Sequence, residues 1–130
     1  MASLDILQSS NVWKYIGIEI TSNEEGKKGV WLKNSENLRQ LHGNIHGGII
    51  ATCVDAALAV AVNEAIGEDK NAVTVELKVN YLLPVVDSDL WAYADLVKAG
   101  RRLLTGTVEV FDNKKNIVAI GSGTFSLINR

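Results

Sequence analysis

The sequence predicts an α+β protein in which a curved antiparallel sheet wraps around one long central helix. The helix is predicted by an apolar run at residues 47–63, in which Asp55 is the only charged side chain. The sheet is predicted by later segments in which polar and apolar residues alternate, separated by short connections. A helix that is apolar nearly all round must be enclosed on most sides, and a strongly curved sheet can enclose it.

Length and composition are those of an ordinary globular protein. The chain has 130 residues, of which 47% are hydrophobic and 22% charged, and its formal net charge is -2. We therefore expect one domain over residues 1–130. Because the chain lacks the basic excess of a general nucleic-acid binder, we expect no nucleic-acid partner.

The first residues and the single cysteine predict a cytoplasmic protein. Residues 1–8 show neither the basic start nor the long apolar segment of a secretory signal. Cys53 lies inside the apolar run and has no partner for an internal disulfide, which favours a small buried hydrophobe in a reducing compartment. The most apolar stretch is about 14 residues long, and a membrane span needs roughly 20, so we expect burial and no membrane partner.

The N-terminal third predicts a short helix followed by a hairpin. Leucines at helical spacing predict a helix over 2–9. Alternation and β-branched residues predict a strand over 12–21, and a second strand is expected at 29–33 after a polar turn. The polar segment 34–40 predicts an irregular connection with one helical turn.

The central helix is expected over 46–66, with Asn44 as the N-cap and Gly67 as the stop signal. Period-two segments interrupted by Pro84 and Gly100 then predict four long strands in an antiparallel meander. These strands are expected at 72–83, 87–99, 102–112 and 116–128. Because they are highly apolar, we expect an edge or outer face of the sheet to pair with another copy of the chain.

Asp55 is the strongest candidate for chemistry. Burial of an unpaired carboxylate costs several kcal/mol or shifts its pKa, and no lysine or arginine lies within two helical turns along the chain. The carboxylate could serve a local structural contact or act as a general base or nucleophile. The cost of burying the charge favours the chemical role.

Gly47 and Gly48 open the helix, where backbone N–H groups lack partners and the helix dipole is positive. Glycines there either allow close helix packing or let a carbonyl oxygen reach the backbone. Gly47 and Asp55 lie about 12 Å apart along a helix axis, too far to share one carbonyl group. Two helices packed antiparallel would bring Asp55 of one chain to the helix start of another, so we expect a site between subunits.

The remaining polar candidates are weaker. His46 either holds a backbone group at the helix start or faces the substrate, and His42 is expected to be structural or exposed. No metal site is expected, because these histidines lie on a glycine turn two helical turns from Asp55. A Ser-His-Asp triad is not supported, since Ser35 lacks the sequence context of a nucleophile elbow. The basic turn at 100–102 is either solvated or in contact with phosphates.

Together these features resemble the hotdog-fold thioesterases, in particular the phenylacetate-degradation (PaaI-like) group of acyl-CoA thioesterases. The resemblance is carried by His46-Gly47-Gly48, Asp55 nine positions after His46, the strand 74–81 leading to Pro84, Gly100-Arg101, and residues 121–125. The resemblance spans roughly residues 29–127. It implies a single hotdog thioesterase domain over residues 1–130, an acyl-CoA substrate, no cofactor, and a homotetramer built from dimers.

The resemblance also implies roles for individual residues. Asp55 would be the nucleophile or the base that activates water, and the N–H of Gly47 would polarise the thioester carbonyl. Gln40 would bind the carbonyl or orient water, Thr74 would hold the water, and His46 would shape the oxyanion site. Asp55 and Thr74 would come from one subunit, and Gln40 and Gly47 from the other.

Substrate contacts are expected from Gly48 beside the oxyanion site, and from Gly100 and Arg101 through coenzyme A. Two other functions stay open at this point. A hotdog hydratase or dehydratase would act on enoyl thioesters with a histidine and a carboxylate, and a non-catalytic module would bind acyl-CoA without turnover. The acyl group itself is left open by the sequence.

Overall fold

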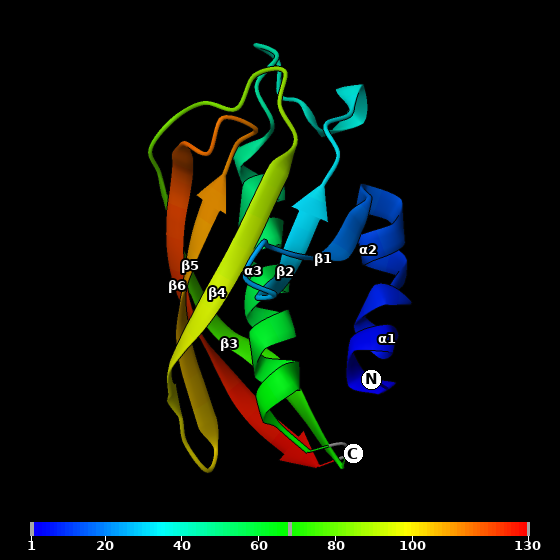
Figure 1. Ribbon diagram of the computed structural model, residues 1–130, viewed down its shortest axis with the longest axis vertical. Helices are drawn as coiled ribbons and strands as arrows, with labels where there is room; N and C mark the ends of the chain where they lie inside the picture. Colours follow the sequence, from blue (N-terminus) through cyan, green and yellow to red (C-terminus); the bar gives the residue numbers. More distant parts are fainter. Residues whose placement is uncertain (1, 68, 130) are drawn as a thin grey trace.

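A computed structural model describes residues 2–67 and 69–129. Its described part contains one six-stranded antiparallel sheet with the long helix α3 (Gly47–Ala65) packed against one face (Figure 1). The strands are β1 (Ile18–Ser22), β2 (Lys28–Leu32), β3 (Lys70–Tyr81), β4 (Leu90–Ala99), β5 (Leu103–Phe111) and β6 (Ile117–Asn129). This arrangement confirms the predicted α+β class and the hotdog fold.

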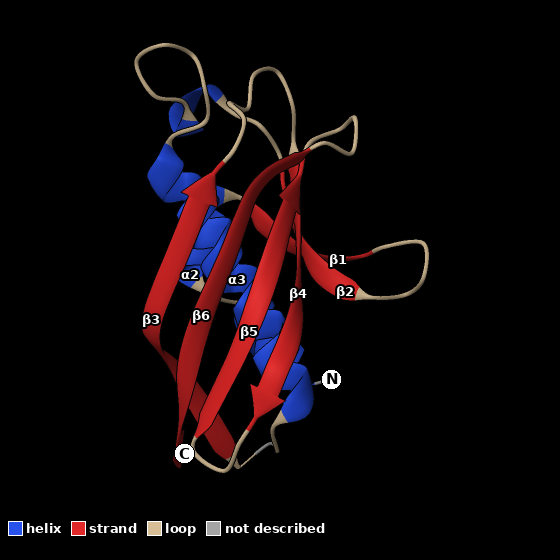
Figure 2. Ribbon diagram, turned by 90° about the vertical axis from the view of Figure 1, so that its left-hand side faces the viewer, coloured by secondary structure: helices blue, strands red, loops and turns tan. Residues whose placement is uncertain are grey.

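The strand order across the sheet is β1-β2-β4-β5-β6-β3 (Figure 2). The predicted meander is correct for β4, β5 and β6 but wrong for β3, which pairs with β6 and forms one edge of the sheet. The connection at residues 82–89, which contains Pro84, carries the chain from the β3 edge past β6 and β5. The next strand, β4, therefore pairs with β2. Short connections favour neighbouring strands, and this one is not short.

The predicted strand over 12–21 is wrong in its first half. After α1 (Ala2–Gln8), a second helix α2 (Asn11–Ile16) precedes β1. Gly17 ends α2 with a φ of 98°, a left-handed conformation that glycine adopts readily, and its N–H donates to the Trp13 carbonyl oxygen. Trp13 is buried and Ile16 packs against the core, so these two residues form the inward face of α2, and the strand alternation begins only after Gly17.

Two further expectations concern the segment around α3. The helical turn predicted within 34–40 is present as the 3-10 helix η1 (Glu36–Leu38). The predicted N-cap Asn44 is wrong: the cap is His46, whose Nδ1 accepts the N–H of Gly48 at 3.0 Å. Asn44 instead closes the preceding loop, where its carbonyl oxygen accepts the N–H of Gln40 at 2.6 Å.

The apolar character of α3 follows from its surroundings. By length and composition alone this helix could cross a membrane, but here it contacts strands β2 to β6 and also α1. Glycines of the sheet let it approach closely. A Cβ atom at Gly121 would lie 2.6 Å from Cγ1 of Val54, and one at Gly123 would lie 2.7 Å from Cδ1 of Leu58.

Strand β3 contains a bulge that changes which residues face α3. The register with β6 shifts between Thr74 and Glu76, which leaves Val75 as the extra residue. After the bulge the side chain of Leu77 packs on the core. Strict alternation would place Val73 and Val75 on that same inner face. Both are instead exposed, at 47% and 59%.

Candidate active site

The first turn of α3 forms the first part of the candidate site. His46 accepts the N–H of Gly48 on its Nδ1, and the hydroxyl of Tyr81 donates to the carbonyl oxygen of Gly47 at 2.7 Å. Within the described residues, no protein acceptor takes the N–H of Gly47. This N–H lies at the positive end of the helix and is available to an oxygen atom of a ligand.

Gln40 lies beside this helix start. The loop that carries it is closed by the hydrogen bond from the His46 N–H to the Leu38 carbonyl oxygen, at 2.8 Å. The Oε1 of Gln40 accepts the N–H of His42, so its amide nitrogen is left as a donor. Gln40 and Gly47 line one cavity of about 300 Å³, which is completed by Asn44, Ile45, Ile50 and residues 81–85. The structure therefore brings Gln40 and Gly47 together within one chain.

Asp55 and Thr74 form the second part. The hydroxyl of Thr74 donates to Oδ1 of Asp55 at 2.7 Å. Asp55 is half-buried in the protomer, and none of the ion pairs among the described residues includes it. Its second carboxylate oxygen can therefore accept a proton or contact a substrate.

These two parts are separate within one protomer. Asp55 lies two turns along α3 from Gly47, and neither Asp55 nor Thr74 lines the cavity that contains Gln40. In one chain, a ligand oxygen at the Gly47 N–H lies away from the Asp55 carboxylate.

The two histidines differ in their contacts. His46 holds the helix start, which is the structural role considered for it, and its acceptor Nδ1 places the proton on Nε2. His42 is exposed. Over residues 2–67 and 69–129, no three His, Cys, Asp or Glu side chains are grouped so that they could hold a metal ion.

Gly100 and Arg101 lie far from Gly47 in the protomer. They form the β4–β5 turn at the end of the sheet where α3 terminates (Figure 1). Together with Lys98, Arg102, Leu103 and Thr105 they line a cavity of about 540 Å³. The three cationic side chains make this turn a suitable contact for an anion, but one protomer does not join it to the helix start.

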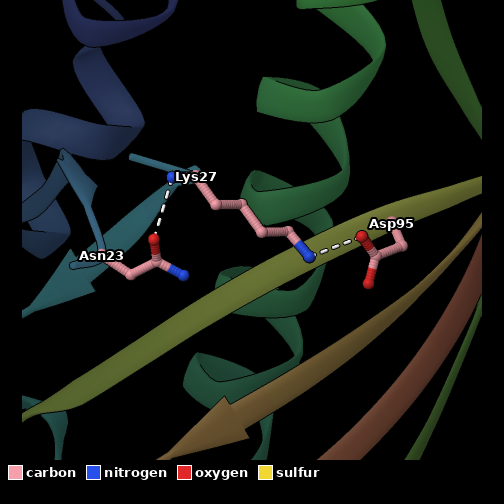
Figure 3. Close-up of polar contacts among 3 residues, drawn as sticks. All are labelled: Asn23, Lys27 and Asp95. Carbon is pink, nitrogen blue, oxygen red and sulfur yellow. Dashed lines mark hydrogen bonds and ion pairs between the residues drawn. The ribbon is translucent and has the colours of Figure 1, made fainter. Parts of the chain in front are cut away.

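The sequence pattern did not reveal a third cavity, of about 460 Å³, on the sheet face away from α3. Its walls include the aromatic side chains of Trp91, Tyr93 and Phe111 and the β1–β2 turn. Lys27 at the end of this turn contacts Asp95 of β4 at 2.5 Å, and the Lys27 N–H donates to the Asn23 side chain (Figure 3). Burial raises the pKa of Tyr93 above its ordinary value.

Tyr81 is the contributor to the candidate site that sequence reasoning missed. The sequence identifies it only as the last residue of the strand 74–81, without a role of its own. The one available signal is its place as an aromatic residue shortly before Pro84, which does not identify a contact with Gly47, 34 positions away.

Comparison with known proteins identifies the family of the chain. Residues 42–119, more than half of the chain, match the family model of the thioesterase superfamily. The chain belongs to this superfamily.

Individual relatives cover nearly the whole chain. A Saccharolobus solfataricus protein named provisionally as an esterase is 29% identical over 121 residues, which is 93% of this chain and 80% of that protein. The 1,4-dihydroxy-2-naphthoyl-CoA hydrolase of Listeria monocytogenes is 26% identical over 112 residues, or 86% and 91% of the two chains. A Bacillus halodurans protein crystallised with CoA superposes with a TM-score of 0.87 at 27% identity, covering 99% of this chain and 88% of that one.

Proposed function

We propose that the protein is an acyl-CoA thioesterase of the PaaI-like group, which hydrolyses an acyl-CoA thioester to a free acid and coenzyme A. The observation that carries the proposal is the 2.7 Å hydrogen bond between Thr74 and the half-buried carboxylate of Asp55. In a thioesterase-superfamily chain, a carboxylate held in this way is suited to activate water or to attack a carbonyl carbon. The CoA hydrolase of Listeria and the CoA-containing structure from Bacillus support this class of substrate.

The first turn of α3 binds the thioester carbonyl in this mechanism. The carbonyl oxygen accepts the N–H of Gly47, and the amide nitrogen of Gln40 is a second donor. Both donors are fixed before the reaction, so they stabilise the negative charge that develops on the oxygen in the transition state. Gly48 leaves the approach to this oxygen free of a side chain.

Asp55 supplies the nucleophilic step. As a base it takes a proton from water, whose oxygen attacks the carbonyl carbon. The tetrahedral intermediate then expels the coenzyme A thiolate, which recovers the proton. As a nucleophile, Asp55 itself displaces the thiolate, and water hydrolyses the resulting anhydride. In either route Thr74 holds Oδ1 and leaves Oδ2 to act.

The mechanism needs two copies of the chain, because the two parts of the site are separate in one protomer. Strand β3 is an edge of the sheet, and the exposed Val73 and Val75 lie on it. Pairing of two β3 edges would join the sheets of two subunits. Asp55 and Thr74 of one subunit would then form one active site with Gln40 and Gly47 of the other.

Two such dimers would form a homotetramer in the cytoplasm. In this assembly Gly100 and Arg101 of the basic turn would contact the phosphates of coenzyme A. Arginine suits this task, because its guanidinium group can donate two parallel hydrogen bonds to a phosphate.

The test is hydrolysis of a panel of aromatic and straight-chain acyl-CoAs. The rate is measured from the appearance of the free thiol of coenzyme A. We expect Asp55→Asn and Asp55→Ala to lower kcat/KM by about 10³-fold or more for the best substrate, with unchanged circular dichroism. Glu64→Gln changes an exposed carboxylate of the same helix and serves as the matched control with native activity.

Near-native hydrolysis by a folded Asp55→Asn variant would reject the role of Asp55. Hydration of crotonyl-CoA in place of thioester cleavage would identify a hydratase. Tight binding of acyl-CoA without turnover by the wild type would identify a binding module.

A further inference from the structure

The peptide group between Gly47 and Gly48 is held at both ends by side chains. Its N–H, from Gly48, donates to His46 Nδ1 at 3.0 Å, and its carbonyl oxygen, from Gly47, accepts the hydroxyl of Tyr81 at 2.7 Å. His46 immediately precedes α3, whereas Tyr81 ends β3. Two different elements therefore fix one peptide group.

This peptide group needs external support more than most. Two successive glycines lack Cβ atoms, so rotation about their backbone bonds meets little steric resistance. The first N–H groups of a helix also have no partners within the helix. The direction of the Gly47 N–H therefore depends on contacts made by its neighbours. The preceding peptide group is held through the His46 carbonyl oxygen, which accepts the N–H of Ile49 at 2.9 Å.

The ring of Tyr81 adds a steric restraint to its hydroxyl contact. A Cβ atom built on Gly47 would lie 3.3 Å from Cζ and 3.4 Å from the hydroxyl oxygen of Tyr81. The ring thus lies directly over Gly47 and closes the space that the missing side chain leaves. Tyr81 is itself 53% exposed, so burial in the core does not explain its position.

Tyr81 also borders the place where the carbonyl would bind. It lines the same cavity as Gln40 and Gly47. We propose that Tyr81 is a positioning residue, which holds the Gly47–Gly48 peptide so that the neighbouring N–H of Gly47 points into this cavity. The proposal rests on the proposed function, because it gives the Gly47 N–H a thioester carbonyl to bind.

The hydrogen bond from the Gly47 N–H should be strongest in the transition state, and this predicts which kinetic parameter changes. A carbonyl oxygen gains negative charge in the transition state, so a well-aimed donor binds the transition state more tightly than the ground state. Loss of alignment should therefore lower kcat and leave KM nearly unchanged. A purely structural role of Tyr81 would instead lower the apparent kcat only in proportion to the folded fraction, so kcat per folded molecule would equal that of the wild type.

The experiment compares Tyr81→Phe, which removes the hydroxyl and keeps the ring, with the wild-type protein. We expect kcat to fall about 10-fold while KM stays within about 2-fold. Tyr81→Leu, which also removes the ring, should lower kcat further. Tyr15→Phe is the matched control, because Tyr15 lies on α2 and is 93% exposed, and its kinetics should equal those of the wild type.

A second measurement is independent of activity. In protein labelled with ¹⁵N-glycine, Tyr81→Phe should shift the amide resonances of Gly47 and Gly48 and leave that of Gly26, in the β1–β2 turn, unchanged. Unshifted Gly47 and Gly48 resonances, or a native kcat in folded Tyr81→Phe, would overturn the proposal. If the wild type hydrolyses no acyl-CoA, the proposed function fails, and the resonances still decide whether the hydroxyl holds the peptide.

Discussion

The two ends of the candidate site lie on one helix but are built by opposite means. In the proposed mechanism the first turn of α3 contributes the backbone N–H of Gly47, a residue without a side chain. Two turns later α3 contributes the side chain of Asp55. A substitution that adds a side chain at Gly47 should therefore disrupt the first part, and a substitution that removes the carboxylate of Asp55 should disrupt the second.

Strand β3 supports both ends, Thr74 contacting Asp55 and Tyr81 contacting Gly47. Seven positions separate Thr74 from Tyr81, and residues an odd number apart lie on opposite faces of a regular strand. The bulge at Val75 adds one residue between them, which turns both side chains toward α3. One irregular strand therefore positions both parts of the candidate site, although one part is a backbone group and the other a side chain.

The largest expected effect tests whether the two halves meet between subunits. Asp55→Asn and Gly47→Val, each inactive alone, should recover activity when unfolded together and refolded as mixed dimers. If each site takes one half from each chain, half of the dimers are mixed and each of these holds one intact site. We expect about a quarter of the wild-type kcat, measured by thioester hydrolysis.

The control for this mixture is Asp55→Asn refolded with Asp55→Ala, in which every site lacks the carboxylate. It should stay inactive. If the first mixture forms dimers but recovers no activity, the proposal that each site combines Asp55 of one subunit with Gly47 of the other is rejected.

A smaller effect is expected at the side-chain end from Thr74→Val, which keeps the shape of Thr74 and removes its hydroxyl. A hydrogen bond to a charged group contributes about 1.5–3 kcal/mol, so kcat/KM should fall about 10- to 150-fold. Thr74→Ser should retain most activity. Thr107→Val, on the exposed outer face of β5, is the control. Equal kinetics of Thr74→Val and Thr107→Val would remove Thr74 from the mechanism.

The long elements could be predicted from the sequence, and the two candidate positions Gly47 and Asp55 could be selected from it, because each depends on local pattern. Alternation identifies strands, an apolar run identifies the enclosed helix, and Asp55 is conspicuous inside that run. The helix α2 was missed because its apolar residues alternate briefly before Gly17. The edge position of β3 was missed because pairing order depends on where a long connection crosses the sheet.

The supporting contacts could not be predicted in the same way. The bulge at Val75 depends on register with β6, and neither strand shows it alone. The contact of Thr74 with Asp55, on the same face of β3 as Tyr81, depends on that bulge. A carbonyl-binding role for Gly47 follows from chemistry at a helix start, but the residue that fixes its direction comes from a different element and only the fold identifies it.

The next prediction disturbs the side-chain end alone. Gly121→Ala places a Cβ atom 2.6 Å from Val54, the neighbour of Asp55, and 3.0 Å from the carbonyl oxygen of Lys78. Such overpacking costs about 1–3 kcal/mol of unfolding free energy, measurable by urea unfolding. The ¹⁵N-glycine resonance of Gly47 should stay in place.

The matched comparison for Gly121→Ala is a double-mutant cycle with Val54→Ala, which removes the atoms in conflict. Val54→Ala should destabilise the Gly121→Ala protein less than it destabilises the wild type. If the two changes in unfolding free energy are strictly additive, the side chain of Val54 does not contact residue 121.

The smallest expected effect concerns Cys53, two positions before Asp55 but facing the core. Burial raises the pKa of Cys53 from 9.0 to about 12. The folded state therefore favours the neutral thiol, while the unfolded chain ionises once the pH passes 9. The stability that this difference provides is complete below pH 9 and declines as the pH rises toward 12. Relative to Cys53→Ala, the wild type should lose about 1.4 kcal/mol of unfolding free energy between pH 8 and pH 10, measured by urea unfolding in reductant. An equal pH dependence of the two proteins would show that this turn of α3 opens to solvent on both faces.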